Sequence, residues 1–221
     1  MKKILFTIIT LIMISGSNDL LAQKSSGNWS VGADILNRWN WRGIDFGNSP
    51  VVQPVIEYAY KGFAIGAWGN YSLSTTNTTE ADLYASYNFD FGLRLDFTDF
   101  YSPIEPGNIG NYFAYDTAHI FEIGGIQTIG NLNLSAYYFL NVDDDLYFEV
   151  SYDFDDVNVF LGAGNNYFTT DGNFMITNLG ISLTKEIKMT EKFSLPLIGK
   201  VIFNPDTEQV YIIFGITLSS D

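Results

Sequence analysis

Charged residues recur at alternate positions within apolar stretches of the chain, so they would share one face of a β-strand. Four are basic and eight are acidic. On a face lining a water-filled lumen such groups stay ionised, and rings of carboxylates favour cations. This balance predicts a lumen with mild cation preference. The residues are Asp34, Arg38, Arg42, Glu57, Glu80, Asp82, Arg94, Asp96, Glu122, Glu149, Asp153 and Lys200.

The same charges have a structural interpretation, in which opposite charges pair across neighbouring strands and hold the wall together. One register of the first hairpin would produce two such pairs. Trp68 shares the polar face with Gly66 and Asn70. It could stack on a sugar or narrow a pore, or it could fill space beside the glycine. The cross-strand positions expected from this register are Arg42 with Gln53, Arg38 with Glu57, and Asp34 with Lys61.

Three further features could carry chemistry. His119 is the only histidine and the one candidate base for an outer-membrane hydrolase, but no serine is tied to it by spacing. Asp143 to Asp145 could bind Ca²⁺, although the spacing of an EF-hand is missing and a solvated acidic loop explains them as well. The long aromatic segment 99–117 could constrict a pore or display a binding surface, and it ends in an Asp-Thr-Ala sequence that resembles an O-glycosylation site at Thr117.

Composition excludes several classes of protein. The 221 residues carry a formal net charge of −14, from 11 Lys and Arg against 25 Asp and Glu, which leaves no basic surface for nucleic acid. There is no Cys and a single His, so disulfides, thiolate metal sites and multi-histidine zinc sites are ruled out. We predict no metal, no cofactor and no catalytic residue.

The N-terminus has the features of an export signal. Lys2 and Lys3 precede an apolar run over residues 4–14 and a stretch with small residues that ends at Ala22. The run is too short to span a bilayer. We expect residues 1–22 to be cleaved, with Ser17 as an alternative end and a retained anchor as another, and residues 23–221 to form one domain.

The rest of the chain alternates between apolar and polar residues over segments about as long as a tilted membrane-crossing strand. The predicted fold class is an all-β, up-and-down antiparallel transmembrane β-barrel of about 12 strands. Short connections alternate with long ones, as in outer-membrane barrels. The predicted strands are 28–42, 51–60, 63–73, 80–89, 91–98, 118–127, 132–140, 146–154, 157–163, 174–186, 193–203 and 209–219.

Aromatic residues on the apolar face gather near the strand ends, as the two girdles of a membrane barrel would. An exported soluble barrel or sandwich, with the apolar face inward, is the alternative. The expected outer girdle is Trp39, Trp41, Tyr71, Tyr138 and Phe203. The expected inner girdle is Tyr58, Tyr60, Phe63, Tyr87, Phe91, Tyr152, Phe154 and Phe193.

Short motifs resemble the TorF-like porins, a family of exported outer-membrane barrels of unknown function. They are Trp41-Arg42-Gly43, Gln53-Pro54, Gly62-Phe63 and the segment 66–69, followed near the end by 184–187 and 204–206. The resemblance extends over nearly the whole exported chain and implies a barrel with a pore. It implies no substrate and no catalytic residues.

We therefore expect a protein of the outer membrane of a Gram-negative bacterium, in contact with lipid and with lipopolysaccharide, that acts as a narrow passive channel for small solutes. A non-conducting structural or surface-binding barrel is the alternative, and a hydrolase using His119 is a further one. An unblocked lumen would favour the channel, whereas a lumen packed with paired charges would favour the structural interpretation.

Overall fold

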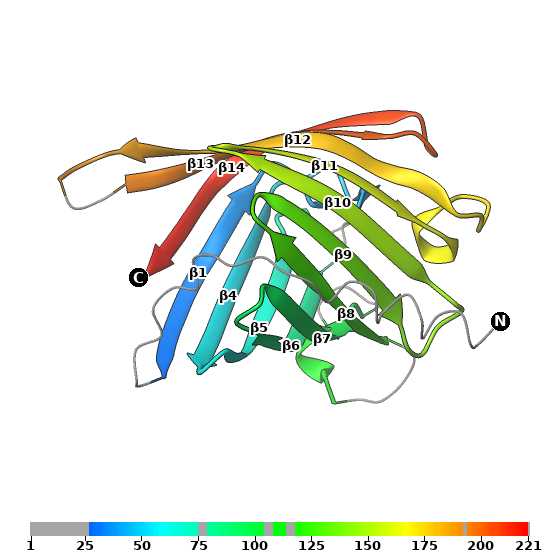
Figure 1. The fold of residues 1–221 in the computed structure, drawn as a ribbon, viewed down its shortest axis with the longest axis horizontal. Helices are drawn as coiled ribbons and strands as arrows, with labels where there is room; N and C mark the ends of the chain where they lie inside the picture. The colour runs from blue at the N-terminus through cyan, green and yellow to red at the C-terminus, as the bar shows by residue number, and fades with distance from the viewer. Residues whose placement is uncertain (1–26, 75–78, 104–107, 114–117, 192–193, 221) are drawn as a thin grey trace.

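Twelve of the described strands close into one antiparallel barrel (Figure 1). The structure is a computed structural model that describes residues 27–74, 79–103, 108–113, 118–191 and 194–220. Neighbours in sequence pair throughout, and β1 closes the ring by pairing with both β14 and β4. The barrel strands are β1 (Asn28–Leu36), β4 (Val51–Tyr60), β5 (Phe63–Ser72), β6 (Glu80–Asn88), β7 (Leu93–Tyr101), β8 (His119–Ile129), β9 (Leu132–Phe139), β10 (Leu146–Phe154), β11 (Val157–Gly164), β12 (Met175–Lys188), β13 (Ser194–Asn204) and β14 (Gln209–Ser220).

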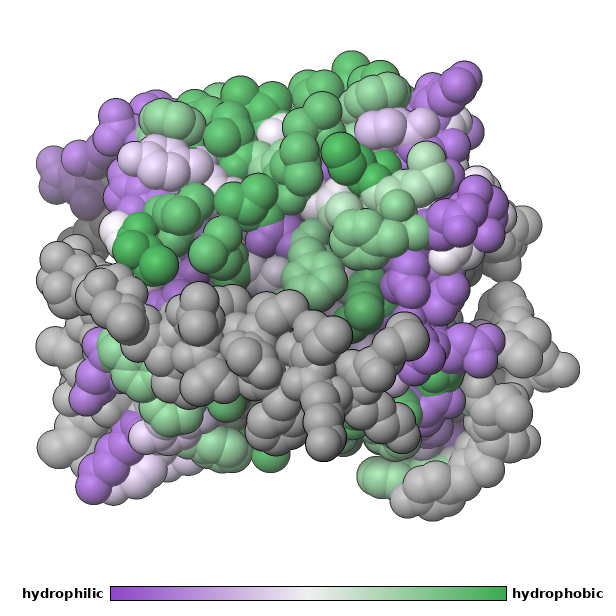
Figure 2. Space-filling view, turned by 45° about the vertical axis from the view of Figure 1, so that its right-hand side comes forward, coloured by the Kyte–Doolittle hydropathy of each residue, from purple (hydrophilic) through white to green (hydrophobic). Residues whose placement is uncertain are grey.

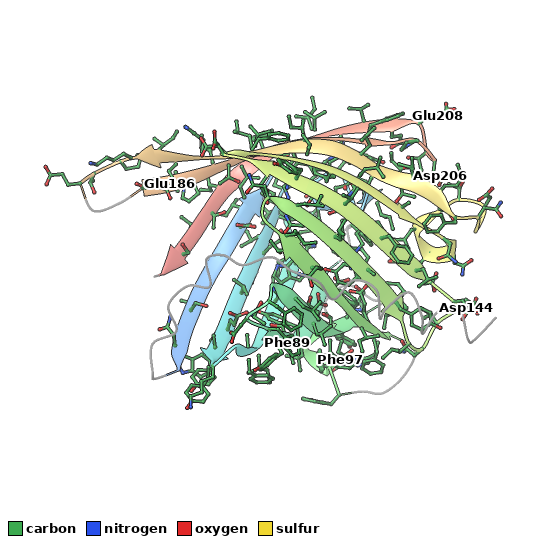
Figure 3. The ribbon with its side chains drawn as sticks, viewed as in Figure 1. Phe89, Phe97, Asp144, Glu186, Asp206 and Glu208 are labelled. Carbon is green, nitrogen blue, oxygen red and sulfur yellow. The ribbon has the colours of Figure 1, made fainter. Side chains whose placement is uncertain are left out.

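The two ends of the barrel differ, as the spacing of the strands predicts. One end, the turn end, carries short connections such as Lys61-Gly62 and Asp155-Asp156, and Lys61, Gly62 and Asp155 have the positive φ angles typical of tight hairpins. The other end, the loop end, carries the longer connections, which include the short 3-10 helices η1 (Asn108–Asn111) and η2 (Asn166–Phe168). Figure 3 shows Asp144, Asp206 and Glu208 at the loop end and Glu186 at the opposite end.

The outer face of the barrel is apolar. Leu83, in the middle of β6, is 45% exposed although it lies in a regular strand. Figure 2 shows a hydrophobic band between two hydrophilic rims. Water would solvate such a continuous apolar surface poorly, whereas lipid solvates it well. The fold is therefore that of a membrane-spanning barrel rather than a soluble one. Other exposed outward residues are Ile56, Ile65, Leu95, Ile123, Leu161, Ile181, Val201 and Ile212.

Aromatic side chains mark both borders of this surface. At the turn end, Tyr60, Phe63 and Tyr87 are exposed, together with Phe91, Tyr152 and Phe154. At the loop end, Tyr71 and Phe203 are exposed. No helix in the described ranges is long and apolar enough to cross a membrane.

The first strand is shorter than predicted, and this changes the register of the first hairpin. The strand ends at Leu36, which pairs with Val51, so Asp34 lies opposite Gln53 and Glu57 lies opposite Ser30. The predicted pairs of Arg42 with Gln53, Arg38 with Glu57, and Asp34 with Lys61 are therefore wrong. Apolar alternation continues past Leu36 because residues 37–50 form a separate hairpin, whose β2 (Asn40–Trp41) and β3 (Ile44–Asp45) pair with each other.

Some predictions fall outside the described residues. These are the export signal in residues 1–22, the modification at Thr117 and the girdle residue Phe193.

Candidate functional site

Residues 37–50, which we call the inner hairpin, turn back at Arg42 and Gly43. The φ angles of these two residues are 53° and 85°, as a two-residue type I′ turn requires. The main chain of Phe46 donates to the carbonyl of Trp39 at 3.0 Å. The rings of Trp39 and Phe46 stack across the hairpin with their centroids 4.1 Å apart.

The inner hairpin lies inside the barrel. One apolar cluster joins Trp39 to the inward-facing residues Leu36, Val51, Ile202, Tyr211 and Ile213. A second cluster, formed by Phe139, Tyr147 and Phe168, packs against Trp41 and Ile44. These residues come from opposite parts of the wall, and a single hairpin can contact them all only from within.

Trp39 and Trp41 therefore do not belong to the outer aromatic girdle, and that prediction is wrong. Trp39 is only 6% exposed and also contacts Trp68, with ring centroids 5.9 Å apart. Trp41 stacks nearly parallel to Phe139 at 6.4 Å and meets the edge of Phe100 at 5.4 Å. Trp68 thus faces the lumen and packs there against the inner hairpin.

The main chain at the tip of the inner hairpin accepts hydrogen bonds from β12 and β13. The Asn204 amide donates to the carbonyl of Gly43 at 3.1 Å, and the Thr177 hydroxyl donates to the carbonyl of Arg42 at 3.3 Å. A Cβ at Gly43 would lie 1.8 Å from the Thr177 carbonyl oxygen. Glycine is therefore required here both by its φ angle and by the close approach of β12.

Arg42 joins the tip to β8 through a bidentate ion pair with Glu122. Its Nη2 lies 3.0 Å from Oε1 of Glu122, and its Nη1 bonds to Oε2. Both side chains are buried, and the guanidinium lies over the rings of Tyr137 and Trp41, at 4.0 Å and 4.3 Å from their centroids. Paired and aromatic contacts of this kind hold a buried guanidinium in one position.

The other predicted charge pairs are replaced by local ones. Arg38 pairs with Asp45 at 3.6 Å and bonds to Asn48, both within the inner hairpin. Glu57 accepts from the Tyr84 hydroxyl at 3.0 Å. Asp34 accepts from the Thr217 hydroxyl at 2.6 Å.

The remaining predicted residues lie at several heights along the wall. Glu80 and Asp82 are buried side by side on β6, where Glu80 accepts from Ser102 and Asp82 from the main chain of Tyr101. Asp96 pairs with Arg94 at 2.6 Å. Glu149 accepts from Tyr147 and Asn178, and Asp153 accepts from Asn133 and Asn158. Lys200 stands opposite Ser182.

A cavity of about 850 Å³ occupies the lumen between the inner hairpin and the turn end. Trp41 and Arg42 border it at one end, and the β6–β7 turn with Asn88 and Phe89 borders it at the other. Arg94 and Glu149 belong to its walls, whereas Asp34, Glu57 and Lys200 do not. The predicted lumen residues are therefore divided: some line open space and others are packed away.

His119 connects Asp99 of β7 to Tyr112 at the loop end. Its Nδ1 lies 2.8 Å from Asp99, and its Nε2 lies 2.8 Å from the carbonyl oxygen of Tyr112. The Tyr112 hydroxyl completes the group by donating to Asp99 at 2.7 Å, and burial followed by this bond raises the pKa of the phenol. A catalytic dyad would direct Nε2 to a nucleophile, whereas here it meets a carbonyl oxygen.

The acidic loop after β9 accepts hydrogen bonds from neighbouring residues of the structure. Asp145 is buried and accepts from the main chain of Tyr167 at 2.7 Å, and its burial raises its pKa. Asp144 accepts from the Tyr138 hydroxyl. Among the described residues, no three His, Asp or Glu side chains come together in a way that could hold a metal ion.

No family model matches the chain, and no curated protein matches it by sequence. Among solved structures it is similar to outer membrane phospholipase A from Escherichia coli, at 11% identity, and to the outer membrane phospholipase of Salmonella typhi, a dimer with bound calcium, at 9% identity. In each case 96% of both chains is covered and the TM-score is 0.40. At these values the likeness does not extend to activity, and the resemblance to TorF-like porins stays a prediction.

Proposed function

We propose that this protein is an outer-membrane channel for small solutes that is gated by the inner hairpin and is closed in the present conformation. One observation carries the proposal: residues 37–50 pack inside the loop half of the barrel, while the turn half holds a cavity of about 850 Å³. The cavity would be the part of the passage in the turn half of the barrel, and the inner hairpin would be the gate in the loop half.

The Arg42–Glu122 pair is the proposed latch of this gate. Removing one partner of a buried ion pair leaves the other charge uncompensated, at a cost of about 3–5 kcal/mol. Displacement of the inner hairpin would let water reach both groups. An exposed ion pair contributes only about 0–1 kcal/mol, so breaking a pair on the protein surface would change the stability of the closed conformation little.

Two features support a passage over a purely structural barrel. The charges that border the cavity include Arg94 and Glu149, which keep hydrogen-bonding capacity that no described residue uses and that a wall built only for stability would not need. Strands β2 and β3 pair with each other and with no barrel strand, so displacement of the inner hairpin would break its apolar packing and the polar contacts at its tip without unpairing a barrel strand. The surplus of lumenal carboxylates supports mild cation preference.

We also propose that the protein is not an enzyme. The support is the geometry of His119, whose two ring nitrogens meet Asp99 and the Tyr112 carbonyl. Apolar outward surface and aromatic borders support contact with outer-membrane lipid, including lipopolysaccharide at the loop end.

Single-channel recording in planar bilayers tests the proposal. We expect rare openings from the wild type and frequent, cation-leaning openings from Arg42→Ala. The matched control is Lys185→Ala, which breaks the exposed pair between Lys185 and Asp156 and should leave the opening frequency unchanged. Folded Arg42→Ala protein that is as silent as wild type would favour the non-conducting structural barrel instead.

A further inference from the structure

The cavity at the turn end has charged groups of opposite sign on separate strands. Arg94 lies on β7, and its side chain is 43% exposed. Its Nε bonds to Asp96, while within the described ranges its two terminal nitrogens make no hydrogen bond. Glu149 lies on β10, where Oε2 accepts from both Tyr147 and Asn178 and Oε1 accepts from no described residue. Each wall thus offers one charge with free capacity toward the cavity.

The surface between these two groups is neutral and partly aromatic. Thr128 and Asn133 bond to each other at 2.8 Å, and Ser135 and Tyr137 continue the wall on β9. Trp41 borders the end of the cavity that lies next to the inner hairpin. Hydroxyl and amide groups beside aromatic rings suit a ligand whose middle is polar but uncharged.

The separation of the charges limits the length of such a ligand. β7 and β10 are three strand spacings apart in the sheet order, which is roughly 14 Å along the wall at about 4.8 Å per spacing. The straight line across the concave wall is shorter. An extended tripeptide spans about 10 Å between its charged termini.

We infer that the cavity binds short zwitterionic peptides, with the terminal carboxylate on Arg94 and the terminal ammonium on Glu149. A guanidinium with two free terminal nitrogens matches a carboxylate, and a carboxylate with a free oxygen matches an ammonium group. That such peptides are the transported solutes rests on the proposed function. Binding itself needs no conductance, because the cavity exists in the closed conformation.

Isothermal titration calorimetry on the detergent-folded protein tests this inference. Trialanine is the probe, and its N-acetylated, C-amidated form removes both charges without changing the protein. We expect the capped form to bind at least tenfold more weakly. Trialanine capped only at its carboxyl end should bind equally to wild type and to Arg94→Gln. Trialanine capped only at its amine should bind equally to wild type and to Glu149→Gln.

The control variant is Lys200→Gln, which changes a lumenal cation outside this cavity and should leave trialanine binding unchanged. Equal binding of free and capped trialanine by wild type would overturn the inference, and so would tighter binding of the neutral sugar maltotriose or the absence of any binding. A protein that binds trialanine but stays silent in bilayers would contradict the proposed channel while leaving this inference intact.

Discussion

At the scale of single residues, the most constrained position is Gly43. Its φ of 85° lies in the region that L-residues avoid, and the β12 main chain closes the space where a side chain would begin. Gly130 has a similar φ of 60°, but no atom lies within 4 Å of the place that a Cβ would take there. Comparing an alanine substitution at each of these two glycines therefore separates the energetic cost of backbone strain from the cost of a steric clash.

Gly43→Ala should lower the free energy of unfolding by more than Gly130→Ala. Both variants bear the left-handed strain of about 1–2 kcal/mol, and only the first must also move the hairpin tip away from Thr177. Urea titration followed by heat-modifiability on gels measures the difference. Equal losses from the two variants would mean that the tip is not docked on β12.

Asp145 provides a residue-scale prediction about pH. Burial raises its pKa, so the folded protein keeps this proton over a pH range in which the unfolded chain has lost it. Stability should therefore fall as pH rises from about 4, the ordinary Asp value, through the raised pKa.

Asp145→Asn removes this titration and keeps an oxygen that accepts the Tyr167 N–H. The unfolding midpoints of the two proteins, measured across this pH range, should diverge, with the variant gaining relative to wild type at higher pH. Parallel midpoints would contradict the raised pKa.

At the scale of elements, the sequence predicts the strands well and the first connection poorly. Alternation places each barrel strand because inside and outside differ in polarity along the whole wall. The same alternation misleads after Leu36, because a hairpin packed inside a barrel is also apolar on the side that meets the wall. The signal that could have located it is Arg42-Gly43 between β-forming residues, a pattern suited to a type I′ turn.

The membrane-facing side of a strand gives the element-scale prediction. Leu83→Arg, in the middle of β6, should destabilise the barrel in lipid by about 2–4 kcal/mol, because the charge meets the centre of the bilayer. Val210→Arg, near the loop-end start of β14, should cost about 0–1 kcal/mol. Unfolding titrations in vesicles compare them, and equal costs would place Leu83 outside the bilayer centre.

At the scale of the whole molecule, the lumen is where sequence and structure differ most. The sequence assigns Arg38, Arg42 and Glu57 to one hairpin register, but Arg42 instead reaches Glu122 across 80 positions of the chain. The alternation of polar and apolar residues along a strand identifies which residues face inward, but it does not show which inward-facing residues contact one another. The inner hairpin determines these contacts, because its own charged and aromatic side chains occupy the lumen and meet the inward-facing residues there.

The pairing of Leu36 with Val51 allows closure of the lumen by the inner hairpin to be tested directly. These two residues face each other across neighbouring strands, so residues 37–50 can be replaced by Asn-Gly, a two-residue hairpin connection. The deletion removes the gate and keeps every barrel strand. Single-channel conductance of the heat-modifiable, folded deletion variant is the measurement that we would make. We expect long-lived open steps from the deletion variant where the wild type is mostly closed. A folded deletion variant that stays silent, or a wild type that conducts equally well, would contradict closure of the lumen by the inner hairpin.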